Sequence, residues 1–134
     1  MTMVVPNNGE GDALGYFVNK QSPQDLVLRL YKSNTTPAET DTAGSYTEAD
    51  FTGYSSVSLT GASWTLTEGA PSHADYAQQS FTSSAGSQNQ DVYGWYATRT
   101  TSGRIACAER FATAPWNIAN NGDKIQVTPV ITAD

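Results

Sequence analysis

Apolar residues recur at every second position in short segments along most of the chain, and this pattern constrains the fold most strongly. Leu26, Leu28 and Leu30 show it in residues 25–32. A period of two is that of a β-strand, in which successive side chains point to opposite faces. The alternation therefore predicts strands for most of the chain after residue 24.

Turn signals rich in Gly, Pro, Asn and Ser separate these segments. The expected strands lie within residues 25–32, 46–51, 56–60, 63–67, 76–82, 92–99, 105–111 and 124–131. About seven or eight short strands, spaced by roughly ten residues, are typical of an antiparallel β-sandwich. We therefore predict an all-β fold, a single jelly-roll-like β-sandwich in which residues 92–99 form a central strand.

One short helix is predicted near residues 9–20, before the first strand. Asn7 or Asn8 is expected to cap its N-terminus. Three apolar residues fall on one face at helical spacing: Leu14, Phe17 and Val18. Gly11 and Gly15 each cost about 1 kcal/mol relative to Ala, so the helix should depend on docking onto the domain.

The length of 134 residues predicts one domain that folds without a disulfide or a metal. Residues 1–8 are expected to form an extended N-terminal arm, and residues 9–134 the β-sandwich domain with its helix. Residues 1–6 lack the basic start and long apolar stretch of a signal peptide. No apolar run reaches the length of a membrane span. We expect a protein that is made in the cytoplasm.

Charge and residue counts narrow the classes of partner and cofactor. Thirteen acidic and seven basic residues give a net charge of −6, which repels phosphate backbones and disfavours nucleic acid as a partner. Cys107 is the only cysteine and His73 the only histidine. These counts exclude an internal disulfide and a zinc site built mainly of Cys and His. We expect no cofactor and no membrane partner.

No residue pattern predicts a catalytic site. Ser72, His73 and Asp75 are neighbours in sequence, but a catalytic triad is defined by its three-dimensional geometry. We interpret His73 as an exposed loop residue. Cys107 alternates in phase with Ile105, and we interpret it as a buried strand side chain rather than a nucleophile. The protein is therefore predicted not to be an enzyme.

Several carboxylates lie in or near predicted loops. They are Glu39, Asp41, Glu48, Asp50, Glu68 and Asp75. Two of them could form a glycosidase pair or several a calcium site, but residues 39–50 lack the alternating Asp and Asn pattern of a dedicated calcium loop. We favour chance proximity among thirteen acidic residues.

Two further groups of residues have more than one interpretation. Glu109 and Arg110 fall on opposite faces of one predicted strand, so one of them approaches the core. Arg99 or Arg104 on the neighbouring strand is expected to supply a charged partner. The aromatic residues of 92–99 either pack in the core, which we favour, or form a platform on which sugar rings stack.

Five stretches, which together span most of the chain, resemble small virion proteins of tailed bacteriophages. They are residues 4–10, 28–37 with 39–42, 54–64, 76–81 and 109–129. The last is the most informative, since it reads as a strand, an aromatic corner, an Asn-Asn-Gly-Asp turn and a strand. The resemblance is strongest to capsid cement, or decoration, proteins, which sit on the outer shell and bridge neighbouring capsid subunits.

The resemblance implies a protein of the outer capsid surface, made in the bacterial host, that binds the major capsid protein. It also implies self-association, with trimers common among such proteins. The arm is expected to add a strand to a neighbour's sheet. The predicted partner-binding residues are Thr2, Met3, Val4, Val5, Pro6, Asn7, Asn8, Thr36, Pro37 and Trp116. The alternative is a tail or head-fibre component that binds carbohydrate as an adhesin.

Overall fold

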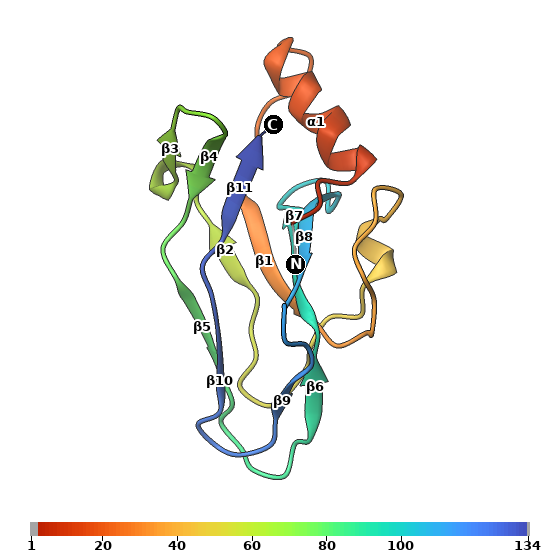
Figure 1. Ribbon diagram of the computed structural model, residues 1–134, viewed down its shortest axis with the longest axis vertical. Helices are drawn as coiled ribbons and strands as arrows, with labels where there is room; N and C mark the ends of the chain where they lie inside the picture. The colour runs from red at the N-terminus through yellow and green to blue at the C-terminus, as the bar shows by residue number, and fades with distance from the viewer. Residues whose placement is uncertain (1–2, 134) are drawn as a thin grey trace.

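The computed structural model describes residues 3–133 and shows a mainly β protein with one α-helix (Figure 1). The elements are α1 (Asn7–Phe17), β1 (Leu26–Tyr31), η1 (Ala43–Ser45), β2 (Val57–Leu59), η2 (Gly61–Ser63), β3 (Thr65–Thr67), β4 (Ser72–Asp75), β5 (Gln79–Thr82), β6 (Gln90–Val92), β7 (Gly94–Arg99), β8 (Ile105–Arg110), β9 (Trp116–Ile118), β10 (Lys124–Val127) and β11 (Val130–Ala133). Within residues 3–133, neither α1 nor the short 3-10 turns are long and apolar enough to cross a membrane.

All strand pairs are antiparallel. The largest sheet has the order β2-β1-β7-β8, and a second has the order β11-β4-β3. Two further pairs, β10 with β5 and β6 with β9, extend these sheets toward the opposite end of the molecule from α1 (Figure 1). The predicted all-β fold with one short N-terminal helix is confirmed. The jelly-roll-like packing of the sheets into a sandwich stays a prediction.

The structure has more and shorter strands than the seven or eight predicted, because eleven lie within residues 3–133. The predicted strand 92–99 is divided at Tyr93 into β6 and β7, and 124–131 is divided before Pro129 into β10 and β11. Proline has no N–H to donate to a strand partner, which explains the second interruption. Residues 46–51 contribute only an isolated bridge, between Glu48 and Tyr31.

The core lies against β1 and β7. All six residues of β7 are buried, since it runs between β1 and β8 in the largest sheet. This confirms the central strand predicted from the aromatic pattern. Leu28 and Leu30 of β1 are fully buried in the main cluster. Burial of a side chain of this size stabilises the fold by about 1.5–3 kcal/mol. A second, smaller cluster of buried residues contains Tyr31, Tyr46, Tyr96, Ile105 and Ala108.

The helix docks by a different face from the one predicted. Gly9, Asp12 and Gly15 are its buried residues. A Cβ at Gly9 would lie 2.2 Å from the Ala106 carbonyl oxygen, so glycine is what lets the helix backbone approach β8 this closely. The apolar face defined by helical spacing, with Leu14, Phe17 and Val18, is exposed instead.

The capping and the end of the helix were also predicted wrongly. Pro6 is the N-cap residue, and Asn7 and Asn8 already belong to the first turn, which has no side-chain cap hydrogen bond. The proline ring fixes φ, and the backbone at Pro6 is extended, with φ −64° and ψ 162°. The helix ends at Phe17 and not near residue 20, because a turn follows in which Asn19 has a positive φ of 58°.

The N-terminal segment pairs with the chain's own sheet. Val4 forms an antiparallel bridge with Ala108, with N–H···O distances of 2.8 and 2.9 Å. Pro6 is fully buried, and the Asn7 N–H donates to the Glu39 carbonyl oxygen at 2.8 Å. Thr2, which was predicted to bind a partner, lies outside the described residues. The outer edge of β8 is therefore covered at Ala108 by this chain itself.

Candidate functional site

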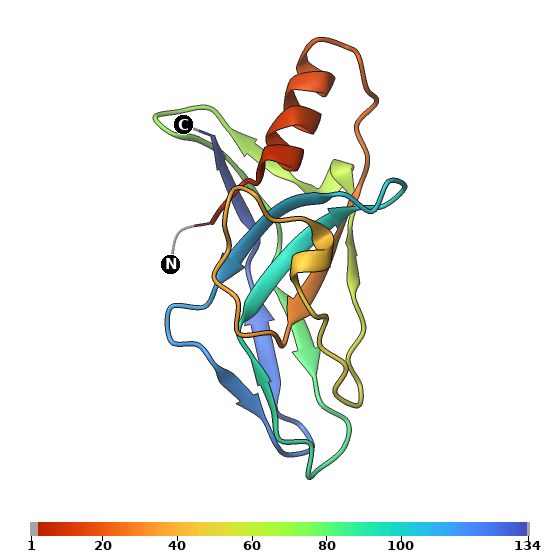
Figure 2. The same ribbon diagram turned by 90° about the vertical axis from the view of Figure 1, so that its right-hand side faces the viewer.

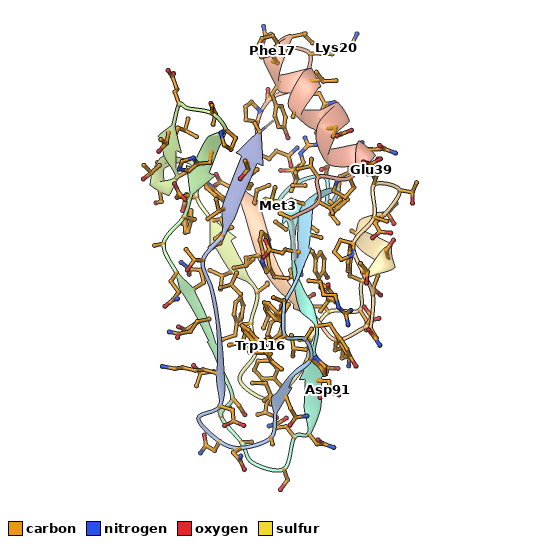
Figure 3. All side chains as sticks on the ribbon, in the orientation of Figure 1. Met3, Phe17, Lys20, Glu39, Asp91 and Trp116 are labelled. Atoms are coloured by element: carbon orange, nitrogen blue, oxygen red, sulfur yellow. The ribbon has the colours of Figure 1, made fainter. Side chains whose placement is uncertain are left out.

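The strongly exposed large apolar side chains of residues 3–133 gather at one end of the molecule. They come from α1 and β3, which lie at the same end in Figure 1, and Phe17 is labelled there in Figure 3. The exposed fractions are 66% for Leu14, 88% for Phe17, 65% for Val18 and 79% for Leu66. Contiguous exposed apolar groups mark sites of protein interaction. We call these residues, together with Ile131 and Ala133, the α1–β3 surface.

A groove separates α1 from the sheet β11-β4-β3. Figure 2 shows the helix and the β3–β4 hairpin diverging at this end. A cavity of about 570 Å³ lies between Ala13 and Leu14 of α1 and Ile131 and Ala133 of β11. A second cavity, of about 310 Å³, shares Ile131 and Ala133 and reaches Leu66. The two cavities thus connect the exposed helix face with the exposed residue of β3.

The walls of this groove are set by strand register. Leu66 of β3 lies opposite Ala74 of β4, which in turn lies opposite Ile131 of β11. Residues that are directly opposite share one face of a sheet, so these three form an apolar row. Val5 and Ala13 line both the large cavity and a smaller one of about 270 Å³ beneath the helix.

A buried ion pair fixes α1 in place. Asp12 and Arg99 are 3% and 4% exposed and form a salt bridge, and Arg104 Nε lies 3.2 Å from the same Asp12 Oδ2. Burial alone would raise the pKa of Asp12, but the hydrogen bonds from Arg99 and Arg104 lower it below its usual value. The Arg99 guanidinium also lies 5.1 Å from the centre of the Tyr16 ring. Removing one partner of such a pair is costly.

The predicted pairing of Arg99 or Arg104 with Glu109 is wrong, because both arginines bind Asp12 from the helix. Glu109 is half-buried, and this burial raises its pKa. Arg110 instead holds a loop, since it donates to the Asn34 Oδ1 at 2.8 Å and to a nearby backbone carbonyl oxygen. Sequence spacing could not reveal that a helical aspartate reaches strand β7.

The sequence-predicted partner residues are not brought together. Val5 lines the groove, whereas Trp116 lies in the other half of the molecule from Phe17 (Figure 3). Trp116 is half-buried and stacks on Phe111 with 4.1 Å between ring centres. Thr36 is exposed and Pro37 half-buried in the loop after β1.

The apolar residues of α1 and Leu66 were missed as surface residues. Helical spacing correctly placed Leu14, Phe17 and Val18 on one face of the helix. The same spacing occurs in buried and in exposed apolar faces, so it could not show that this face is exposed. The one available signal was the recurrence of Gly9, Asp12 and Gly15 at intervals of three. Such small residues allow a close approach on the opposite side of the helix.

The aromatic residues of β7 pack in the core. Trp95 and Tyr96 are 3% and 4% exposed, and the Arg110 guanidinium covers the Tyr93 ring at 5.1 Å. The favoured core interpretation is confirmed for Trp95 and Tyr96. A sugar-stacking platform on these two residues is wrong, because their rings do not reach the surface.

Cys107 and the neighbours Ser72, His73 and Asp75 are not arranged around a common site. Cys107 is 1% exposed on β8, as predicted, and burial raises the pKa of its thiol to about 12. His73 lies on β4 and not in a loop, with its Nε2 3.2 Å from Asp75 Oδ2. The Ser72 hydroxyl bonds to Gly69 instead of to His73. Ser72, His73 and Asp75 therefore do not form a hydrogen-bonded triad.

The loop carboxylates tie residues 41–50 to the sheet. Glu48 pairs with Arg29 at 2.8 Å, and Asp50 pairs with Lys32 at 2.7 Å. In the part of the chain that the structure describes, no three His, Cys, Asp or Glu side chains are grouped to hold a metal ion. The ion pairs of Glu48 and Asp50 therefore hold a long loop against the sheet.

Comparisons with models of protein families, with curated proteins and with solved structures found no match for this chain. The fold and site define a mainly antiparallel β protein with one docked helix and an apolar surface at the helix end.

Proposed function

We propose that this protein is a structural component of a tailed-phage virion, most similar to a capsid cement protein. It would bind the major capsid protein on the outer shell and bridge neighbouring subunits. The observation that carries the proposal is the α1–β3 surface, where four large apolar side chains are at least 65% exposed. Such a surface suits a contact between the subunits of an assembly, because burying each side chain contributes about 1.5–3 kcal/mol.

The chemistry of the rest of the surface is compatible with this role. A net charge of −6 is acceptable on the outer face of a shell, where the protein does not contact packaged DNA. Many copies in symmetric contact hold tightly even when each single contact is weak. The proposal assigns the protein no catalytic step.

The segment before α1 is bound to the chain's own sheet and is therefore less available to a partner. Val4 is held on β8 by two backbone hydrogen bonds, so a strand exchanged with a neighbour would first have to leave Ala108. Contacts through side chains that are already exposed or half-exposed need no such release. Thr36, Pro37 and Trp116 are therefore better placed than Val4 to contact the capsid protein.

The test is the abundance of this chain in purified particles of the phage that encodes it. Quantitative mass spectrometry is expected to find a copy number comparable to that of the major capsid protein. A copy number far below it would favour the alternative, a tail or head-fibre adhesin. Absence of the chain from mature particles would contradict both functions.

A further inference from the structure

We propose that the α1–β3 surface joins two copies of this chain, related by a two-fold axis. Each copy would place the ridge formed by Leu14, Phe17 and Val18 in the groove of the other. The inference depends on the proposed function only for its place in a virion. The contact itself is a property of the purified chain.

The shape of the end is self-complementary. Phe17 is 88% exposed at the last turn of α1. Leu14, one turn earlier on the same ridge, lines the groove together with Ile131 and Ala133 of β11. The ridge and the groove therefore lie side by side on one surface. In a two-fold contact the same surface is used by both subunits, so one rotation fills both grooves.

The same end of the molecule carries both a basic and an acidic group, which favours a second copy of this chain as the partner. Lys20 follows the ridge, lies beside Phe17 in Figure 3 and makes no ion pair with any of residues 3–133. Glu10 lines the large cavity and Glu68 the adjoining one, and neither is ion-paired within the described part of the chain. The two-fold contact brings Lys20 of each copy toward the acidic groove of the other.

Four large apolar side chains that are 65% or more exposed, together with the groove walls Ile131 and Ala133, would form the centre of such an interface. A standard interface buries about 800 Å² per partner. Lys20, Glu10 and Glu68 would then form the polar rim that surrounds the apolar centre of an interface.

The test is the mass of the full-length chain by sedimentation velocity over a range of concentrations. The wild-type chain is expected to reach twice the mass of one chain. Phe17→Asp and Leu66→Asp are each expected to hold it at the mass of one chain, because they place a charge in the contact. Ala112→Asp adds the same charge at an exposed position outside the α1–β3 surface and should leave the dimer intact.

A charge exchange gives a second readout that does not depend on apolar contact. Lys20→Glu is expected to weaken the dimer at least tenfold, and combining it with Glu68→Lys is expected to restore part of the loss. A wild-type chain that stays monomeric at every concentration would overturn the proposal, and so would a trimer. Equal behaviour of Phe17→Asp and Ala112→Asp would overturn it as well.

The two-fold contact and the virion role can fail independently of each other. A dimer of a chain that is absent from phage particles leaves the two-fold contact standing and removes the virion role. A monomer that is abundant in particles removes the two-fold contact and leaves the virion role.

Discussion

Asp12 is the residue on which the position of α1 depends most. Its carboxylate is 3% exposed and binds two guanidinium groups, one of which, that of Arg99, is itself buried. A buried pair of this kind contributes little compared with a well-packed apolar pair, but it specifies a single arrangement because either half alone is costly. The pair thus determines which face of the helix is turned to the sheet and which face is left exposed.

Replacing Asp12 with Asn tests this role. Asp12→Asn leaves the buried Arg99 without a counter-charge and is expected to lower the free energy of unfolding by about 3–5 kcal/mol. Urea unfolding followed by circular dichroism measures the change. Arg104→Gln removes the more exposed partner and should cost less than about 1 kcal/mol. Equal losses of stability in the two variants would contradict the conclusion that the buried pair of Asp12 and Arg99 holds α1 in place.

The same carboxylate predicts a pH dependence. The pKa of Asp12 is lowered in the folded chain, so the folded state binds fewer protons than the unfolded state near that pKa. The stabilisation is therefore fully present above the unfolded pKa and is lost as the pH falls through the folded pKa. As the pH falls below the ordinary pKa of an aspartate, the stability of the wild-type chain should fall more steeply than that of Asp12→Asn. Parallel curves in urea titrations would show that Asp12 contributes nothing to this dependence.

At the scale of the element, α1 is a helix in which Gly9 and Gly15 face inward and the large apolar residues face outward. A Cβ at Gly9 would meet the Ala106 carbonyl oxygen at 2.2 Å, whereas a Cβ at Gly11 meets nothing within 4 Å. The two positions are in the same helix and differ only in what lies beside them. They form a matched pair for testing how the helix docks.

Gly9→Ala is expected to destabilise the chain by about 1–3 kcal/mol or to detach α1, because the backbone of β8 cannot move aside cheaply. Gly11→Ala is expected to stabilise it by about 1 kcal/mol through helix propensity alone. Thermal or urea unfolding of both variants measures the difference. If Gly9→Ala were as stable as Gly11→Ala, the close approach of the helix to β8 would be wrong.

The strands were predictable because their signal is local. Alternation identified β1 with the buried residues Leu28 and Leu30, and aromatic residues on both faces identified β7 as a central strand. The orientation of α1 was not predictable in this way, because it depends on Arg99 and Ala106, which lie far along the chain in β7 and β8. The apolar face of a helix is normally its buried face. In this protein the polar and glycine face is buried instead, and the candidate site is the consequence.

At the scale of the whole molecule, the two ends differ in character. The end with α1 and β3 carries the exposed apolar side chains of the described residues. The opposite end is formed by the β5–β10 and β6–β9 pairs and their loops (Figure 1), with polar side chains such as Asp91 labelled toward it in Figure 3. This polarity supports an account in which the helix end makes the apolar contacts in an assembly.

The most direct measurement is the reactivity of a cysteine placed at the ridge in purified particles. Because Cys107 is buried, a maleimide added to Phe17→Cys reports on position 17, and Gly86→Cys in an exposed loop is the matched control. Because urea also exposes Cys107, the labelled residue is located by peptide mass spectrometry. The account predicts that position 17 is protected in the particle and becomes reactive when the chain is unfolded in urea, while position 86 reacts in both. Rapid labelling of position 17 in intact particles would contradict the claim that this surface is buried by assembly.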